Sequence, residues 1–250
     1  MSSVSTSGTS AGKVLLTGAS GHLGANLLRR LVTEGYQVRV LIRPGSDNAA
    51  IDGVDCERIY GDLRDAESVD RAVNGCRRIF HAAAKVSTIF GNAAHKREIY
   101  DCNVIGTRNI LAAAKKFDVE RTCVTGSFSA VGYNHDNPSL PSTEEMRIYP
   151  FERMMPYEAS KTFVELECLS AANRGVDVVI ATSCAILGPH DYKPSRMGRA
   201  LCDFANGKLH AYVEGGFEFV SVDDLVEGHI LTMNKGRRGE KYVFSTEFLS

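Results

Sequence analysis

The sequence lacks any apolar run long enough to cross a bilayer, and it has no excess of charge of either sign. A membrane-spanning helix needs about 20 consecutive apolar residues, so we expect no membrane span. Lysine and arginine number 29, aspartate and glutamate number 30, and the basic residues are scattered along the chain. This balance argues against a nucleic acid as a partner, and we expect a small-molecule substrate instead.

Patterns for metal binding and for disulfides are also missing. The 7 cysteines form no CxxC pair, most of them lie in apolar runs, and the histidines show no metal-ligand spacing. We therefore expect reduced, buried thiols, no metal site and a cytoplasmic location. Residues 1–12 are rich in Ser, Thr and Gly but lack the charge and apolar core of a signal peptide, so they predict a disordered tail.

After this tail, strand-like and helix-like segments alternate. Short apolar runs predict strands over 13–18, 36–42, 56–63, 77–84, 121–127 and 176–183. Helical periodicity predicts helices over 22–35, 66–73 and 93–117, and another that contains Tyr157. This alternation indicates an α/β fold with a doubly wound, mainly parallel sheet. We expect a dinucleotide-binding domain over 13–188 and a small substrate-binding lobe over 189–250, interleaved with the last strands.

The segment TGASGHLG, residues 17–24, lies between the first strand and the first helix. Gly18 allows a tight turn, Gly21 allows the backbone to approach a pyrophosphate, and Gly24 allows the helix to pack on the strand. The free N–H groups and dipole of a helix start attract an anion. The strand–turn–helix context therefore predicts a dinucleotide site.

The identity of the dinucleotide is read from the end of the second strand. An acidic residue there would bind the ribose 2′-hydroxyl of NAD, but the strand ends in VRVLIRPGS, with Arg39 and Arg43. Arg43 favours a 2′-phosphate and hence NADP; a solvated surface arginine, and thus NAD, is the alternative. Asp62 and Leu63 follow the third strand, where they could hold the adenine.

Tyr157 and Lys161 lie four residues apart and thus on one face of a helix. A ketone that receives hydride at carbon needs a proton at oxygen, which a tyrosine can donate. A nearby ammonium lowers the pKa of the phenol, so we expect Lys161 to do so for Tyr157. Ser127 ends a neighbouring strand and could donate a hydrogen bond to the same substrate oxygen.

The ordered motifs GxxGxxG, GDL at 61–63, HAAA at 81–84, NVIGT at 103–107, VTGSFSAVG and YEASK at 157–161 resemble an extended short-chain dehydrogenase/reductase of the NAD-dependent epimerase/dehydratase superfamily. Within this group, the residues of these motifs are most similar to the dihydroflavonol-reductase and 3β-hydroxysteroid-dehydrogenase type. The resemblance implies a Rossmann fold and a catalytic set of four residues, which are Ser127, Tyr157, Lys161 and Asn103. It also implies cofactor contacts from Tyr157 and Lys161 and from the following residues: Gly18, Ser20, Gly21, His22, Leu23, Gly24, His81, Ala82 and Ala83.

The sequence also departs from this family. The dehydratase branch has acidic residues at the positions of Phe128 and Ser129, so sugar dehydration is not expected. Relatives usually continue beyond Ser250, so we expect a reduced or truncated C-terminal lobe, with thin cover for the substrate over residues 190 to 250.

We expect an NADP-dependent oxidoreductase that interconverts a hydroxyl and a ketone on a mostly apolar molecule, such as a steroid, terpenoid, flavonoid or polyketide. The alternatives are a nucleotide-sugar epimerase with tightly held NAD and a dinucleotide-binding protein without activity. The resemblance also leaves a homodimer open.

Overall fold

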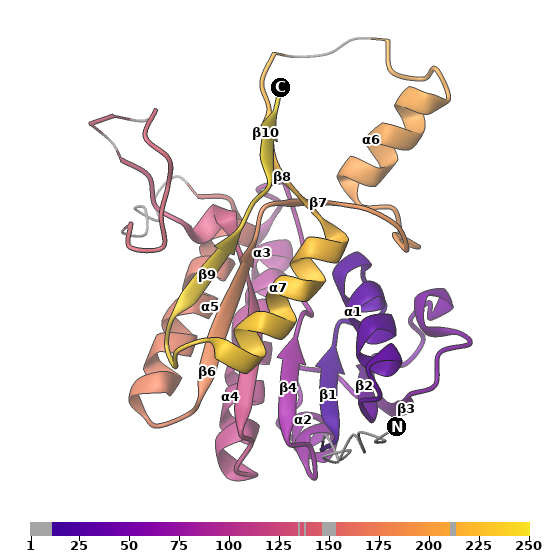
Figure 1. Cartoon of the computed structure of the whole chain (residues 1–250), viewed down its shortest axis with the longest axis vertical. Helices are drawn as coiled ribbons and strands as arrows, with labels where there is room; N and C mark the ends of the chain where they lie inside the picture. The colour runs from indigo at the N-terminus through magenta and orange to yellow at the C-terminus, as the bar shows by residue number, and fades with distance from the viewer. Residues whose placement is uncertain (1–11, 135, 138, 147–153, 211–213) are drawn as a thin grey trace, which may run out of the picture.

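The computed structural model describes residues 12–250 apart from 135, 138, 147–153 and 211–213. A central sheet lies between two layers of helices, and a smaller sheet and a helix project from one end (Figure 1). The predicted disordered tail falls almost entirely outside the described residues.

The central sheet has seven strands in the order β3-β2-β1-β4-β5-β6-β9, and every neighbouring pair is parallel. The strands are β1 (Val14–Thr17), β2 (Val38–Ile42), β3 (Glu57–Tyr60), β4 (Arg78–His81), β5 (Arg121–Ser127), β6 (Val178–Ser183) and β9 (Lys241–Phe244). Chain order reverses between β1 and β4, which is where doubly wound sheets bind their ligands. The predicted fold class is thus confirmed.

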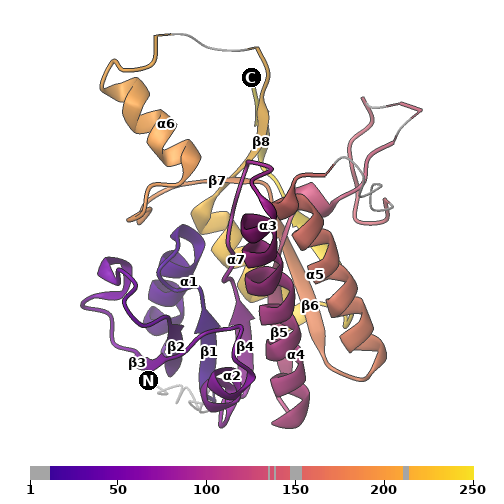
Figure 2. The same ribbon diagram turned by 180° about the vertical axis from the view of Figure 1, so that it is seen from behind.

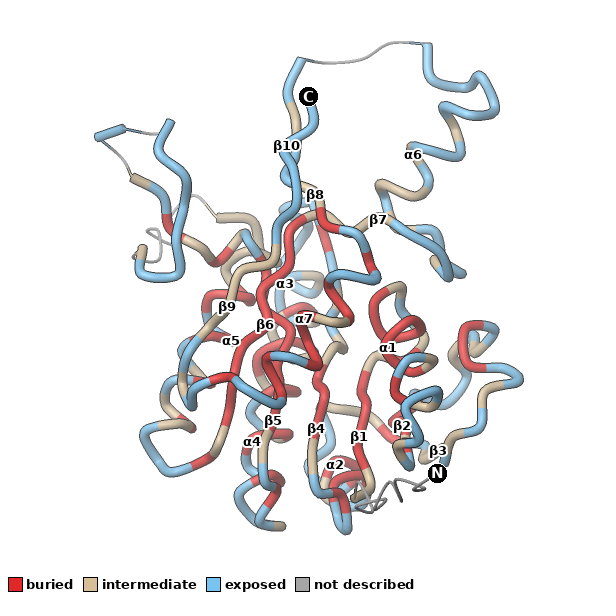
Figure 3. The backbone as a smooth tube through the Cα atoms, viewed as in Figure 1, coloured by how far each residue is buried: buried red, intermediate tan, exposed pale blue. Residues whose placement is uncertain are grey.

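Helices cover both faces of this sheet. On one face lie α1 (His22–Thr33) and α7 (Val222–Lys235), which pack against each other. On the other face, seen from the front in Figure 2, lie α2 (Ala66–Val73), α4 (Gly106–Lys116) and α5 (Pro156–Asn173). The buried side chains of the strands therefore divide into two cores, one on each face. The buried residues concentrate in the central strands and the helices that cover them, whereas α6 and β10 are mostly exposed (Figure 3).

The predicted helix over 93–117 is continuous but not uniform. It consists of α3 (Ala93–Tyr100), a π-helical turn over Asp101–Ile105 and α4. A π turn adds one residue to the turn and often occurs at functional sites. Here it contains Asn103, which is buried.

Residues after β6 contribute to two sheets. A three-stranded sheet of order β10-β8-β7 contains β7 (Ala185–Leu187), β8 (Phe217–Ser221) and β10 (Glu247–Leu249). In contrast, α7 packs on the central sheet, and β9 is its last strand. Between β7 and β8 lies α6 (Arg196–Ala205), which has no buried residue. The division into domains at residue 188 stays a prediction.

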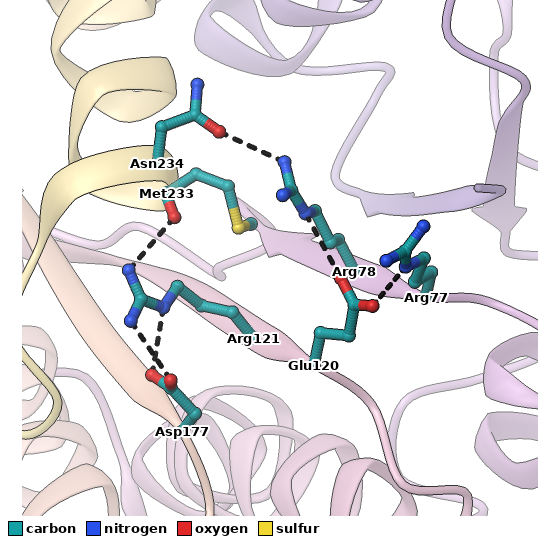
Figure 4. Close-up of polar contacts among 7 residues, drawn as sticks. All are labelled: Arg77, Arg78, Glu120, Arg121, Asp177, Met233 and Asn234. Carbon is teal, nitrogen blue, oxygen red and sulfur yellow. Dashed lines mark hydrogen bonds and ion pairs between the residues drawn. The ribbon is translucent and has the colours of Figure 1, made fainter. Parts of the chain in front are cut away.

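Polar contacts join the end of α7 to the amino ends of β4 and β5, which lie opposite the predicted site (Figure 4). Arg121 pairs with Asp177 at 2.9 Å and donates a hydrogen bond to the carbonyl oxygen of Met233 at 3.1 Å. Arg78 donates to the side chain of Asn234 at 3.0 Å. These contacts join β4, β5 and α7, so the C-terminal helix is a part of the central fold.

The described residues bear on four expectations, which concern membrane spans, metal sites, disulfides and a homodimer. No helix among them is long and apolar enough to span a membrane, and no cluster of ligating side chains in this part of the chain could hold a metal. All 7 cysteines are free. Leu166 and Leu169 of α5 are each 43% exposed, and a homodimer through such a face stays a prediction.

Candidate active site

A pocket of about 240 Å³ lies at the carboxyl ends of β1 to β4. Predicted cofactor residues that line it are Gly18, Ser20, Gly21, Arg43, Asp62, Leu63, Ala82 and Ala83. They converge because parallel strands present their carboxyl ends on one side of the sheet, and the strand order reverses between β1 and β4. The pocket therefore coincides with the predicted dinucleotide site.

The glycines show that the turn fits a pyrophosphate. A Cβ atom at Gly24 would lie 2.1 Å from the carbonyl oxygen of Gly18, so the turn itself requires glycine there. At Gly21 a Cβ would meet only that same oxygen, at 3.4 Å, which is an ordinary contact. The fold does not need glycine at 21, whereas the close approach of a phosphate would.

The first turn of α1 also suits an anion. Gly21 is the N-cap residue, no side chain caps the helix, and the first turn contains no acidic residue. The backbone N–H groups at this end are thus available, and the helix dipole places positive potential there. Together with the glycine geometry, this arrangement fits a bound pyrophosphate.

The two arginines of β2 have different roles. Arg39 pairs with Glu57 at 2.9 Å and donates to the carbonyl oxygens of Ala72 and Asn74. Its side chain does not line the pocket. Arg43 instead lines the pocket and is exposed. Of the two, only Arg43 can meet a ligand there.

Asp62 lines the pocket, and its carboxylate forms hydrogen bonds with Arg64. Arg64 donates hydrogen bonds to both of its oxygens, at 2.9 and 2.6 Å. These bonds hold the pKa of Asp62 below its ordinary value. Asp62 is therefore ionised at neutral pH and can accept a further hydrogen bond from a ligand amino group.

Six residues from the predicted cofactor set do not line the pocket; two of them, Tyr157 and Lys161, lie on α5. His81 is buried, with Nδ1 2.7 Å from Thr17 Oγ1 and Nε2 3.0 Å from Thr107 Oγ1, so its ring joins β1 to α4. Leu23 belongs to the hydrophobic core, Gly24 packs against the turn, and His22 donates to the carbonyl oxygen of Pro189. Burial lowers the pKa of His81 to about 3, so its imidazole is neutral.

The predicted catalytic residues meet at the carboxyl end of β5. Ser127 is the last residue of β5 and is buried, while Tyr157 and Lys161 lie in the first turns of α5, which packs on β5. Pro156 occupies the first turn of α5, and the side chain of Glu158 accepts a hydrogen bond from the backbone N–H of Met155 at 2.8 Å. These two features fix where the helix begins and thus where Tyr157 points.

Lys161 is held by the strand beneath it. The side chain is 5% exposed, and Nζ donates to the carbonyl oxygen of Thr125 at 2.8 Å. Burial lowers the pKa of Lys161 to about 8, and the nearby Cys168 and Glu165 oppose this shift.

The expected lowering of the Tyr157 pKa by Lys161 is not found in this structure. Burial raises that pKa, and the side chain of Ser127 opposes the rise through a hydrogen bond. Burial of the phenol is the largest cause, and the Lys161 ammonium donates a hydrogen bond to the carbonyl oxygen of Thr125. Tyr157 is accordingly a protonated phenol at neutral pH.

Asn103 holds the surrounding segments together. Its Oδ1 accepts from the backbone N–H of Lys85 at 2.7 Å, and its Nδ2 donates to Ser160 Oγ at 2.9 Å. Ser160 in turn donates to the carbonyl oxygen of Tyr157 at 2.7 Å. The π turn therefore links the loop after β4 to the catalytic helix, and Asn103 positions Tyr157 from a distance.

Sequence reasoning missed several residues of the site. Thr125 and Glu165 contact or face Lys161, and Lys193, Ser46 and Lys85 line the nucleotide pocket. Glu165 could have been found, because it lies one helical turn after Lys161. Lys193 carries no local signal, because its contact with the loop after β2 spans 146 residues of sequence.

The comparisons with known proteins agree with this geometry. Residues 14–244 match the model of the "NAD dependent epimerase/dehydratase family". The chain is 45% identical over 233 residues to "Sterol demethylase protein B" of Methylococcus capsulatus, covering 93% of this chain and 69% of that protein. It is 35% identical over 240 residues to a "Putative dihydroflavonol 4-reductase" of Synechocystis sp., covering 94% and 68%.

A solved structure supports the same assignment. The protein called gox2253 superposes with a TM-score of 0.86 at 33% identity, over 94% of this chain and 70% of that one. The family match over residues 14–244 covers both the nucleotide-binding turn and the Tyr157–Lys161 helix, so the resemblance seen in the motifs is confirmed. The chain belongs to the NAD-dependent epimerase/dehydratase family.

Proposed function

We propose that the protein is an NADP-dependent reductase that interconverts a ketone and a hydroxyl group on a mostly apolar small molecule. One observation carries this proposal. Ser127, Tyr157 and Lys161 meet at the carboxyl end of β5, beside a pocket whose turn fits a dinucleotide. A proton donor and a hydride source are the two components that carbonyl reduction requires.

The protein side chains divide the work of this reaction. The nicotinamide supplies the hydride when the cofactor is bound. Tyr157 donates its phenolic proton to the substrate oxygen, and Ser127 donates a hydrogen bond that orients the same oxygen. Lys161 lies one helical turn after Tyr157 and carries the positive charge of the site. In this proposal that charge favours the phenolate left after the proton has moved, although burial dominates the pKa of the resting phenol.

Apolar side chains around the site support an apolar substrate. Val86, Ile89 and Phe90, in the loop after β4, are 65%, 54% and 59% exposed. Phe128, directly after Ser127, is 45% exposed. Burying such surface against a substrate contributes about 25 cal/mol per Å². The names of the two relatives, which refer to a sterol and a dihydroflavonol, agree with a ring compound of this kind.

Elimination of water from a sugar does not fit the site. The two positions after Ser127 hold Phe128 and Ser129, and the Ser129 hydroxyl lies 2.9 Å from the Ser127 hydroxyl. Neither side chain can act as the carboxylate acid or base that dehydration needs. The site supports proton transfer to one oxygen, which suffices for carbonyl reduction.

Isotope transfer tests this function directly. The protein is incubated with NADPH carrying deuterium at C4 of the nicotinamide, in separate 4R and 4S forms, and with a panel of keto-steroids, flavanones and other cyclic ketones. We expect one deuterium on the new carbinol carbon of at least one apolar ketone, from one of the two forms. Transfer to none of the ketones, together with turnover of nucleotide sugars, would overturn the proposal.

A further inference from the structure

The segment that joins β7 to α6 lies across the start of α1. We call residues 188–195, GPHDYKPS, the strap. The carbonyl oxygen of Pro189 accepts hydrogen bonds from His22 Nε2 at 3.0 Å and from Asn26 Nδ2 at 2.9 Å. Both donors belong to the first turns of α1, directly after the phosphate-binding turn. The strap is thus attached to the nucleotide-binding side of the fold.

A second contact fixes the middle of the strap. The guanidinium of Arg29 lies over the ring of Tyr192, 5.4 Å from its centre, and donates to its hydroxyl at 3.2 Å. The ring of His190 stacks on the ring of Tyr192, with the centres 5.8 Å apart. Since Arg29 also donates to the carbonyl oxygens of Ala25 and Ala50, this contact has a defined geometry.

These contacts place the next residue, Lys193, in the nucleotide pocket. Its Nζ donates to the carbonyl oxygen of Asp47 at 2.8 Å, across the loop that follows β2. Lys193 lines the pocket together with Arg43 and Ser46. Within the described residues, neither cation has a carboxylate at ion-pair distance, although Asp62 lines the same pocket. Two positive charges and a hydroxyl therefore gather beside β2, where a ribose 2′ substituent is expected.

We infer that Lys193 and Arg43 bind the 2′-phosphate of NADP together, with Ser46 as a further donor. This inference rests on the proposed function, because it assigns the residues that select its cofactor. A phosphate carries nearly two negative charges at neutral pH, and an ammonium opposite a guanidinium matches that charge. The ammonium has three donors, so it can bind the phosphate and keep its bond to Asp47. NAD, which has a hydroxyl at this position, gains little from either cation.

The test compares two nucleotides and two fragments on the same variants. NADPH and NADH are titrated by fluorescence, and 2′,5′-ADP and 5′-AMP by calorimetry, against the wild type, Lys193→Met, Lys193→Arg and Arg43→Met. Lys208→Met, at an exposed lysine after α6, is the matched control. We expect Lys193→Met to weaken NADPH and 2′,5′-ADP about 10- to 100-fold, as for the loss of one charged hydrogen bond. NADH and 5′-AMP should change less than about twofold, and Lys193→Arg should restore most of the affinity.

The outcomes separate this inference from the proposed function. Equal weakening of NADPH and NADH by Lys193→Met would show that the strap only stabilises the fold, and unchanged affinity would place Lys193 outside the site; both results overturn the inference. A wild type that reduces ketones with NADH as well as with NADPH overturns it and leaves the oxidoreductase in place. If the wild type binds NADPH more tightly than NADH, and Lys193→Met removes this difference, but no ketone is reduced, the inference is supported and the proposed reaction is wrong.

Discussion

The carboxylate of Glu165 lies 3.1 Å from the ammonium of Lys241, and this ion pair is almost fully buried between α5 and β9. Glu165 is 3% exposed on its side chain, and its second oxygen has no hydrogen-bond partner among the described residues. Glu165 also lies one helical turn after Lys161 and favours the charged form of that lysine. The last strand of the sheet is thereby linked to the charge of Lys161.

This link predicts a pH effect. The rate of ketone reduction should fall as pH rises through about 8, because Lys161 then loses its proton. Glu165→Gln removes a negative charge that favours the ammonium, so the alkaline limb of kcat/KM should move to lower pH. Glu167→Gln is the control, since Glu167 lies on the same helix and pairs with Arg108. An unshifted limb in Glu165→Gln would contradict the assigned role.

The buried Lys161 should cost folding stability. Its pKa in the folded protein is about 8, below the ordinary value of 10.5, so the folded state disfavours its charge. This cost is fully present below pH 8 and disappears above about pH 10.5. Lys161→Met should therefore raise the free energy of unfolding at pH 7 by about 1–3 kcal/mol, with a smaller gain at pH 10. Urea unfolding at both pH values measures this, and a loss of stability at pH 7 would contradict it.

Acid should destabilise the protein through its buried histidines. His229 accepts from Thr125 Oγ1 and donates to the carbonyl oxygen of Leu225, and burial lowers its pKa to about 4. A lowered pKa gives stability that is present above the ordinary value of 6.5 and lost as pH falls towards 4. At pH 5 the loss is about 2 kcal/mol from this group. His229→Gln should flatten the decline of unfolding free energy between pH 7 and 5, measured by urea denaturation. If the unfolding free energy of His229→Gln declines as steeply as that of the wild type, groups other than His229 cause the acid sensitivity.

Two glycines of the phosphate-binding turn should respond differently to alanine. Gly24→Ala places a Cβ 2.1 Å from the Gly18 carbonyl oxygen, so both the turn and the fold should suffer. Gly21→Ala meets that oxygen at 3.4 Å, so the melting temperature should change little while nucleotide affinity falls. Calorimetric unfolding and nucleotide titration of both variants check this contrast. Normal nucleotide binding by Gly21→Ala would place the pyrophosphate elsewhere.

Regular segments of the fold could be predicted from the sequence because their signals are local. Strand β5 and helix α2 have the predicted bounds, and the other central strands end within a few residues of them. The turn at 17–24 was predicted because its glycines carry a backbone requirement at fixed spacing. By contrast, β8 and β10 are short and mostly exposed, so they lack an apolar period.

The parts of the site that could not be predicted depend on contacts distant in sequence. The ring of His81 was expected at the cofactor, but two threonines from β1 and α4 hold it inside the fold. Lys161 was expected to lower the pKa of Tyr157, but burial of the phenol raises that pKa, and Lys161 donates to the carbonyl oxygen of Thr125. The sequence supplies the residue types at such positions, while the direction of each side chain follows from the packing of three or more elements.

The central claim, that Tyr157 donates the proton, is tested most directly by the single-turnover rate of ketone reduction in Tyr157→Phe. The substitution removes one oxygen atom and should leave the fold and the affinity for NADPH unchanged. Tyr60→Phe, at a tyrosine that is 56% exposed on β3, is the matched control and should react as the wild type does. We predict a rate about 10²- to 10⁴-fold lower for Tyr157→Phe, the range for loss of an acid catalyst. A rate within a fewfold of the wild type, with NADPH bound, would contradict the account.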